Sequence, residues 1–72
     1  MNKRANKLTE LCELEGMTEV EMLRSAVVDG TCPSICMNDG CNFTADYEPD
    51  SIEGWCDECD TNTVMSGLEL AI

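Results

Sequence analysis

Apolar residues in the first third of the chain recur with the period of an α-helix. Leu8, Leu11 and Cys12 are spaced i, i+3 and i+4, so they share one helical face, and Glu15 continues that face with a polar side chain. Residues 1–7 show no such pattern and carry three of the basic side chains. We therefore expect a frayed basic start over residues 1–7 and a first helix from residue 8.

A second helical pattern follows Gly16, which is expected to end the first helix. It opens with Thr18 and Glu21, the two ends of a T-x-x-E capping box in which each side chain accepts a hydrogen bond from the other residue's backbone N–H. Its predicted apolar stripe consists of three residues at helical spacing, with Met22 and Ala26 beside them: Val20, Leu23 and Val27. Because helices this short are unstable alone, residues 8–30 are expected to form a helical hairpin packed on the rest of the chain.

In the middle of the chain, apolar residues recur at every second position, which is the period of a β-strand. Residues 31–35 contain Pro33 and are predicted to be a linker. Phe43, Ala45 and Tyr47 then alternate with polar residues, which predicts a short half-buried strand, and residues 52–55 are expected to return as a second strand.

The last segment, residues 61–72, predicts a short helix in which Val64, Leu68 and Ile72 share one stripe. A strand is the alternative here, since Gly67 weakens the prediction of a helix.

Two close pairs of cysteines frame the predicted hairpin. Cys36 and Cys41 form C-x4-C, fourteen residues follow, and Cys56 and Cys59 form C-x2-C. Zinc prefers four ligands in a tetrahedron, and two such pairs on tight loops can supply them from opposite sides. The spacing predicts a two-stranded zinc ribbon with one Zn²⁺ per chain, although Cys32 could replace Cys36 or Cys41, or stay free and buried. Cys12 is expected to act as a small apolar residue on the first helix.

A four-cysteine site leaves no open position for a substrate, so the metal is expected to be structural and the protein not to be an enzyme. The sequence contains no histidine. Iron is the main competing metal, because four thiolates also suit a single iron ion. A redox role for Cys56 and Cys59 is disfavoured by acidic neighbours such as Asp57 and Glu58, which oppose thiolate formation.

A chain this short is expected to need a bound metal ion or disulfide bonds to stabilise its fold. A core built from 72 residues, with only three aromatic side chains, usually supplies no more than about 3–5 kcal/mol. The N-terminal region has glutamates where an export signal needs an apolar segment, and no stretch reaches the ~20 apolar residues that span a bilayer. We expect a cytoplasmic protein, where thiols stay reduced and clustered cysteines more often bind metal than form disulfides.

The charge is strongly negative and unevenly distributed. The net charge is −11, and residues 25–72 contain ten carboxylates and no lysine or arginine. Nucleic-acid affinity depends on basic side chains, so a helix-turn-helix or other nucleic-acid reader is disfavoured. An unidentified protein partner, for instance one with a basic face, fits this charge better. The basic residues all lie in the first third of the chain: Lys3, Arg4, Lys7 and Arg24.

From residue 33 onward the chain resembles a group of small bacterial zinc-ribbon-like proteins of uncharacterised function. The resemblance covers about 40 of the 72 residues and rests on the combination of ICMNDGC, FT, EPD, GWCDEC and TNTV, followed by a serine and an apolar Leu/Ala/Ile end. It implies that Cys36, Cys41, Cys56 and Cys59 are the ligands, with Cys32 outside the set, and it implies no activity. Proteins of this group often have glycine after the second pair, where this chain has Asp60.

These observations predict a single small α+β domain over residues 1–72, stabilised by metal. It combines the helical hairpin of residues 8–30, the zinc ribbon of residues 31–60 and the C-terminal helix of residues 61–72. The expected core includes Trp55, Phe43 or Tyr47, and Leu68. The expected function is a non-enzymatic protein–protein interaction module; the alternatives are a nucleic-acid-binding ribbon, a rubredoxin-like electron carrier, or a metal buffer that takes further ions through Cys12 and Cys32.

Overall fold

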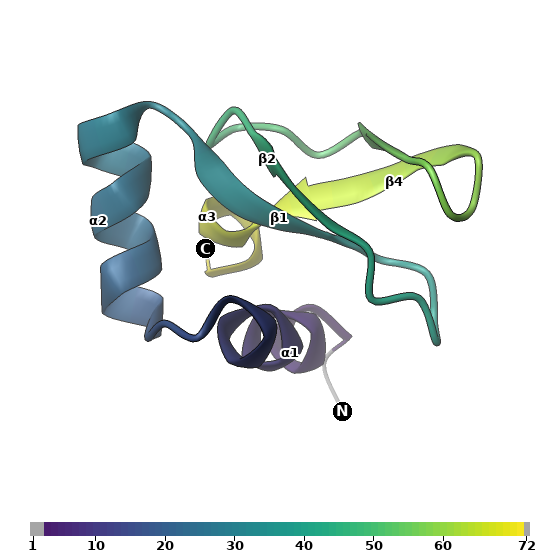
Figure 1. Cartoon of the computed structure of the whole chain (residues 1–72), viewed down its shortest axis with the longest axis horizontal. Helices are drawn as coiled ribbons and strands as arrows, with labels where there is room; N and C mark the ends of the chain where they lie inside the picture. Colours follow the sequence, from purple (N-terminus) through teal and green to yellow (C-terminus); the bar gives the residue numbers. More distant parts are fainter. Residues whose placement is uncertain (1–2, 72) are drawn as a thin grey trace.

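The computed structural model describes residues 3–71 and has an α+β fold (Figure 1). Along the described chain the elements are α1 (Lys3–Glu15), α2 (Glu19–Asp29), β1 (Cys32–Cys36), β2 (Thr44–Tyr47), β3 (Gly54–Cys56), β4 (Thr61–Ser66) and α3 (Gly67–Ala71). Helices α1 and α3 lie on one side of an antiparallel sheet, and α2 lies at one end of it. None of these helices is both long and apolar enough to cross a membrane.

The sheet has four strands in the order β2-β1-β4-β3, so the prediction of a two-stranded ribbon was wrong. Two hairpins, β1–β2 and β3–β4, are joined by antiparallel pairing between β1 and β4. Residues 31–35 were predicted to be a linker, yet most of them belong to β1. Pro33 is tolerated because at this position β1 pairs only with β2, and its pairing with β4 begins at Ser34.

The prediction of a helix over residues 61–72 was also wrong in its first half. Residues 61–66 form β4, which lies inside the sheet, and only Gly67–Ala71 is helical. The β-branched residues Thr61, Thr63 and Val64 favour a strand, and the Ser66 hydroxyl accepts a hydrogen bond from the Glu69 N–H at the start of α3. Ile72, the last residue of the predicted stripe, lies outside the described residues.

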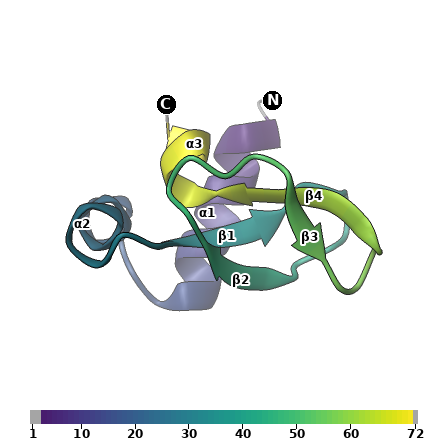
Figure 2. The ribbon, with the colours of Figure 1, turned by 90° about the horizontal axis from the view of Figure 1, so that it is seen from above.

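The sheet curls, so that its two edge strands meet through a tyrosine. Two strands separate β2 from β3 in the sheet, yet the Tyr47 hydroxyl donates a hydrogen bond to the Trp55 carbonyl at 2.6 Å. The Tyr47 ring lies directly against the Cα of Gly54, where a Cβ would come within 2.9 Å of the ring. The curl is visible in Figure 2, where β2 and β3 lie on the same side of the two central strands.

Helix α1 packs beneath the sheet and begins earlier than predicted. Leu8 and Leu11 are buried in the main core, as their spacing predicted. Residues 3–7, however, were expected to fray and are helical. The side chains of Lys3 and Lys7 explain the extension, because both contact the loop after β1.

Helix α2 presents a different face to the core from the one predicted. Its capping box is present, with Thr18 and Glu21 hydrogen-bonded in both directions as predicted. Met22 and Ala26 are buried, whereas Val20 and Val27, two members of the predicted stripe, are exposed. The buried face of α2 is rotated about the helix axis relative to the predicted stripe. In this orientation the large Met22 side chain fills the space beside Gly67.

The two helices do not form the expected hairpin of antiparallel neighbours. In Figure 1, α1 is seen nearly along its axis and α2 from the side. In Figure 2, α2 is seen along its axis and α1 from the side, so the two helices are far from antiparallel. Each helix packs instead against β1 and α3, which separates their buried faces.

The buried residues form two clusters. The larger lies between the helices and the sheet and contains seven residues: Leu8, Leu11, Met22, Ala26, Cys32, Ile35 and Leu70. The smaller one consists of Cys36, Cys56 and Val64, with Phe43 and Tyr47 packed against it. Leu68 packs on the larger cluster, but Trp55 was wrongly placed in the core: it is 44% exposed. Successive strand side chains point to opposite faces, so a buried Cys56 turns Trp55 outward.

Gly67 marks a close approach between α3 and α2. A Cβ at this position would overlap the Sδ atom of Met22 and lie 3.2 Å from the Pro33 carbonyl oxygen. Gly67→Ala is therefore expected to lower the free energy of unfolding by about 1–3 kcal/mol, despite the better helix propensity of alanine. Denaturant unfolding of the metal-loaded protein measures this change.

The matched control is the same substitution in a Met22→Ala background, where the new methyl group has room. Most of the cost of Gly67→Ala should disappear in that background. An equal loss of stability in both backgrounds would contradict the overlap with Met22.

Candidate metal centre

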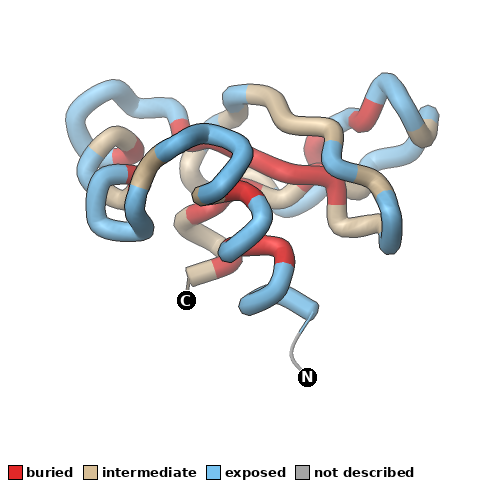
Figure 3. Tube along the Cα trace, turned by 60° about the horizontal axis from the view of Figure 1, so that its bottom comes forward, coloured by how far each residue is buried: buried red, intermediate tan, exposed pale blue. Residues whose placement is uncertain are grey.

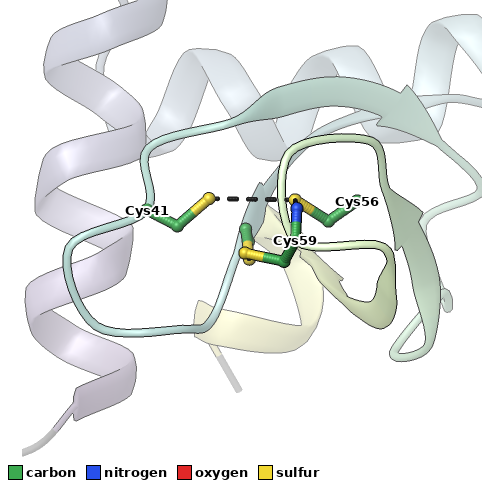
Figure 4. A group of neighbouring side chains, drawn as sticks. Cys41, Cys56 and Cys59 are labelled. Atoms are coloured by element: carbon green, nitrogen blue, oxygen red, sulfur yellow. Dashed lines mark hydrogen bonds between the residues drawn. The ribbon is translucent and has the colours of Figure 1, made fainter.

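Four cysteines converge at one end of the curled sheet. Cys36 lies at the end of β1 and Cys56 at the end of β3; Cys41 and Cys59 lie in the loops that follow these strands. All four Sγ atoms lie within 4.8 Å of one another. In Figure 4 the side chains of Cys41, Cys56 and Cys59 point toward a common centre from two separate loops.

Two of the distances between the sulfur atoms match those of a tetrahedral metal site. The Sγ atoms of Cys41 and Cys56 are 3.7 Å apart, and those of Cys36 and Cys59 are 3.9 Å apart. Zinc–sulfur bonds of about 2.3 Å in a regular tetrahedron place the sulfur atoms about 3.8 Å from one another. These distances are far longer than a disulfide bond, and all six cysteines are free. The geometry is compatible with one bound metal ion.

The first loop is shaped by its own backbone. The Cys36 N–H donates to the Phe43 carbonyl at 2.9 Å, which closes the base of the loop, and the Cys41 N–H donates to the Asn38 carbonyl at 3.1 Å. Gly40 has a φ of +79°, a conformation that glycine adopts without strain. This turn brings Cys41 back toward Cys36.

The second loop is tighter. The Asp60 N–H donates to the Cys56 carbonyl at 2.8 Å, and the Cys59 N–H points at the Cys56 Sγ at 3.4 Å. Asp60 has a φ of +55°, a left-handed conformation that aspartate tolerates better than most residues other than glycine. An N–H directed at a ligand sulfur stabilises the thiolate that a metal requires.

Hydrogen bonds join the first loop to β4, the strand that follows the second loop. The Met37 N–H donates to the Thr63 carbonyl at 2.7 Å. The Asn38 Nδ2 group reaches the hydroxyls of Thr61 and Thr63, both at 3.4 Å. The Thr63 hydroxyl also lies 3.2 Å from the Cys36 Sγ. The four thiols are thus held by a scaffold that spans both hairpins.

The thiols differ in acidity because they share one small volume. Burial raises the pKa of Cys36, but hydrogen bonds from the Thr63 hydroxyl and the Asn38 backbone N–H outweigh it and lower that pKa to about 7. The Phe43 backbone N–H lowers the pKa of Cys41, yet burial and the neighbouring thiols raise it to about 12. Burial is the main cause that raises the pKa of Cys56. The Cys36 thiolate therefore forms more readily than those of Cys41 and Cys56, whose protons a bound cation would replace.

The remaining cysteines lie outside this group. Cys32 is fully buried in the larger core cluster, and Cys12 is half-buried on α1 beside that cluster. Burial raises the pKa of the Cys12 thiol, and Glu19 raises it further. Cys12 thus occupies the apolar position predicted for it.

Lys7 is the residue near the centre that sequence reasoning missed. Its ammonium group donates to the carbonyls of Asn38 and Cys41, at 2.9 and 2.7 Å, and its side chain is only 8% exposed. The available signal was its place one position before Leu8, on the edge of the apolar face of α1. Because residues 1–7 were predicted to be frayed, no buried role was expected for Lys7.

No protein-family model matches this chain, and comparisons with curated proteins and with solved structures likewise gave no match. The resemblance to small bacterial zinc-ribbon-like proteins therefore stays a prediction from the residues.

Removal of one ligand tests the four-cysteine assignment. An apparent zinc-binding free energy of ~10–16 kcal/mol, shared by four ligands, loses on the order of 3 kcal/mol when one is removed, which is about 100-fold in affinity. Cys59→Ser is expected to weaken zinc binding by about this factor in a chelator competition. Cys12→Ser is the matched control and should leave the affinity unchanged. Equal affinities for the two variants would contradict the assignment.

Proposed function

We propose that the protein binds one structural Zn²⁺ through Cys36, Cys41, Cys56 and Cys59. The observation that supports this most directly is the convergence of the four Sγ atoms within 4.8 Å, with two of their distances close to those of a zinc–thiolate tetrahedron. Zinc would contribute directly to folding, because the apolar clusters formed by residues 3–71 are modest. Six free thiols fit a reducing compartment such as the cytoplasm.

The metal in this proposal has no catalytic role. Four thiolates complete the tetrahedron and leave no position at which zinc could activate water or polarise a substrate. Two of the four ligands, Cys36 and Cys56, are fully buried. The zinc therefore fixes the two loops relative to each other, and the protein acts through its surface.

We further propose that this surface binds a protein partner, chiefly through the outer face of α2. Val20, Val27 and Val28 are 65%, 84% and 74% exposed there. Helical spacing places these three residues around Arg24, on the side of α2 opposite the buried Met22 and Ala26. Met22 and Ala26 are the buried residues of α2, and the rest of the helix, at the left in Figure 3, is exposed or intermediate. Clustered exposed apolar side chains are typical of interaction sites.

The charges around this face indicate the chemistry of the partner. Acidic residues flank it at both ends of α2: Glu19, Glu21 and Asp29. A helix with apolar anchors and an acidic border fits an apolar groove bordered by basic side chains. Nucleic acid does not fit, since the phosphate backbone would meet carboxylates on a protein of net charge −11.

Affinity capture with the zinc-loaded protein tests the proposal. Val20, Val27 and Val28 are replaced together by serine, which should abolish capture of the partner because the apolar contact is lost. The matched control is Ile52→Ser, which changes an exposed apolar residue (51% exposed) far from α2 in the sequence and should leave capture intact. Circular dichroism confirms that both variants are folded.

Two results would overturn the interaction role. One is capture that is identical for the serine variant and the control. The other is a failure to recover any protein, combined with tight binding of DNA or RNA at ~0.15 M salt, a concentration that weakens purely electrostatic binding.

A further inference from the structure

Helix α1 contacts the loop after β1, which carries Cys41, through two lysines that lie one helical turn apart. Lys3 forms an ion pair with Asp39, with 3.6 Å between Nζ and Oδ1, and both side chains are largely exposed. Lys7 reaches the same loop, but its ammonium group is buried and donates to two backbone carbonyls of the loop. The two contacts therefore differ in kind: an exposed ion pair contributes little, whereas a buried charge must be compensated.

The partners of Lys7 compensate its charge only in part. An ammonium group has three N–H donors, and here two of them go to the neutral carbonyls of Asn38 and Cys41. The described carboxylate that pairs with it is Glu10, whose Oε1 lies 3.7 Å away on a side chain that is 46% exposed. A longer, half-solvated ion pair compensates a buried charge weakly.

A loaded metal centre would supply the missing negative charge. Four thiolates around one divalent cation carry a net charge of −2, and Cys41 contributes both a ligand sulfur and the carbonyl that binds Lys7. The turn that aims the two carbonyls at Lys7 is the same turn that brings Cys41 into the site. Metal binding and docking of α1 thus require one loop conformation.

We propose that Lys7 is a positioning residue of the metal centre and that it couples metal binding to the docking of α1. This inference rests on the proposed metal site. Metal that fixes the loop after β1 strengthens the docking of α1, and docked α1 strengthens metal binding by the same factor, because coupling between two binding events is reciprocal. Loss of metal weakens the docking of α1 by that factor, while Leu8 and Leu11 still pack in the larger core cluster.

The coupling is first measured in the unmodified protein. Backbone amide hydrogen exchange is compared between the zinc-loaded protein and the protein treated with a chelator. The proposal predicts that zinc slows exchange in α1, far from any ligand in sequence, as well as in the two cysteine loops. Zinc-induced protection confined to residues 36–41 and 56–59, with α1 unchanged, would overturn it.

Variants then assign the coupling to Lys7. Lys7→Met keeps the apolar stem but removes the charge, and it is expected to weaken zinc binding about tenfold, as substitutions next to metal ligands do, and to remove the zinc-dependent protection of α1. Lys3→Met removes the same charge from the same helix and loop, but at an exposed position, and should change neither quantity. Lys7→Arg retains a donor and a charge and should restore part of the zinc affinity that Lys7→Met loses.

The outcomes separate the coupling from the metal site itself. If the unmodified protein binds zinc but Lys7→Met matches Lys3→Met in affinity and in α1 protection, the coupling is wrong and the metal site stands. If Lys3→Met weakens zinc binding as much as Lys7→Met, the effect is one of overall charge and the role of Lys7 is likewise wrong. If the unmodified protein binds no metal, the metal site falls and the coupling with it.

Discussion

Four thiols confined within 4.8 Å of one another are stable as neighbours only while most of them keep their protons or share a cation. This constraint organises the second half of the chain. β1 ends at the first cysteine loop and β3 ends at the second, and the pairing of β1 with β4 holds the two hairpins in one sheet. The curl that brings Tyr47 against Gly54 encloses the same group of thiols. A metal ion would therefore act on the geometry of the whole sheet.

The helices depend on this centre less directly. α1 and α3 cover the sheet through the larger core cluster, which contains none of the four clustered cysteines. The link between the two regions runs through the loop after β1, where the buried ammonium of Lys7 meets the carbonyl of Cys41. Lys7 thus joins the helix that covers the apolar core to the loop that carries Cys41, and Met37 of the same loop packs on that core. α2 lies at the end of the sheet opposite the four cysteines, and its valines are exposed to solvent.

The sequence allowed the site to be predicted better than the fold around it. Spacing favoured the pairs Cys36 with Cys41 and Cys56 with Cys59 but left Cys32 as an alternative, and the structure brings the first four together. The strand at Pro33 could not be read in the same way, since its tolerance depends on which neighbour each end of β1 pairs with. The rotation of α2 and the burial of Lys7 depend equally on distant partners, Gly67 and the carbonyls of the cysteine loop. Local periodicity carries no information about such contacts.

The most direct test of the account is native mass spectrometry of the purified protein, with elemental analysis and a count of free thiols on the same sample. The account predicts one zinc ion per chain and, after mild denaturation that spares the site, two reactive thiols, those of Cys12 and Cys32. A chain without metal and without free thiols would contain three disulfides. That result would contradict both the metal centre and the fold built around it.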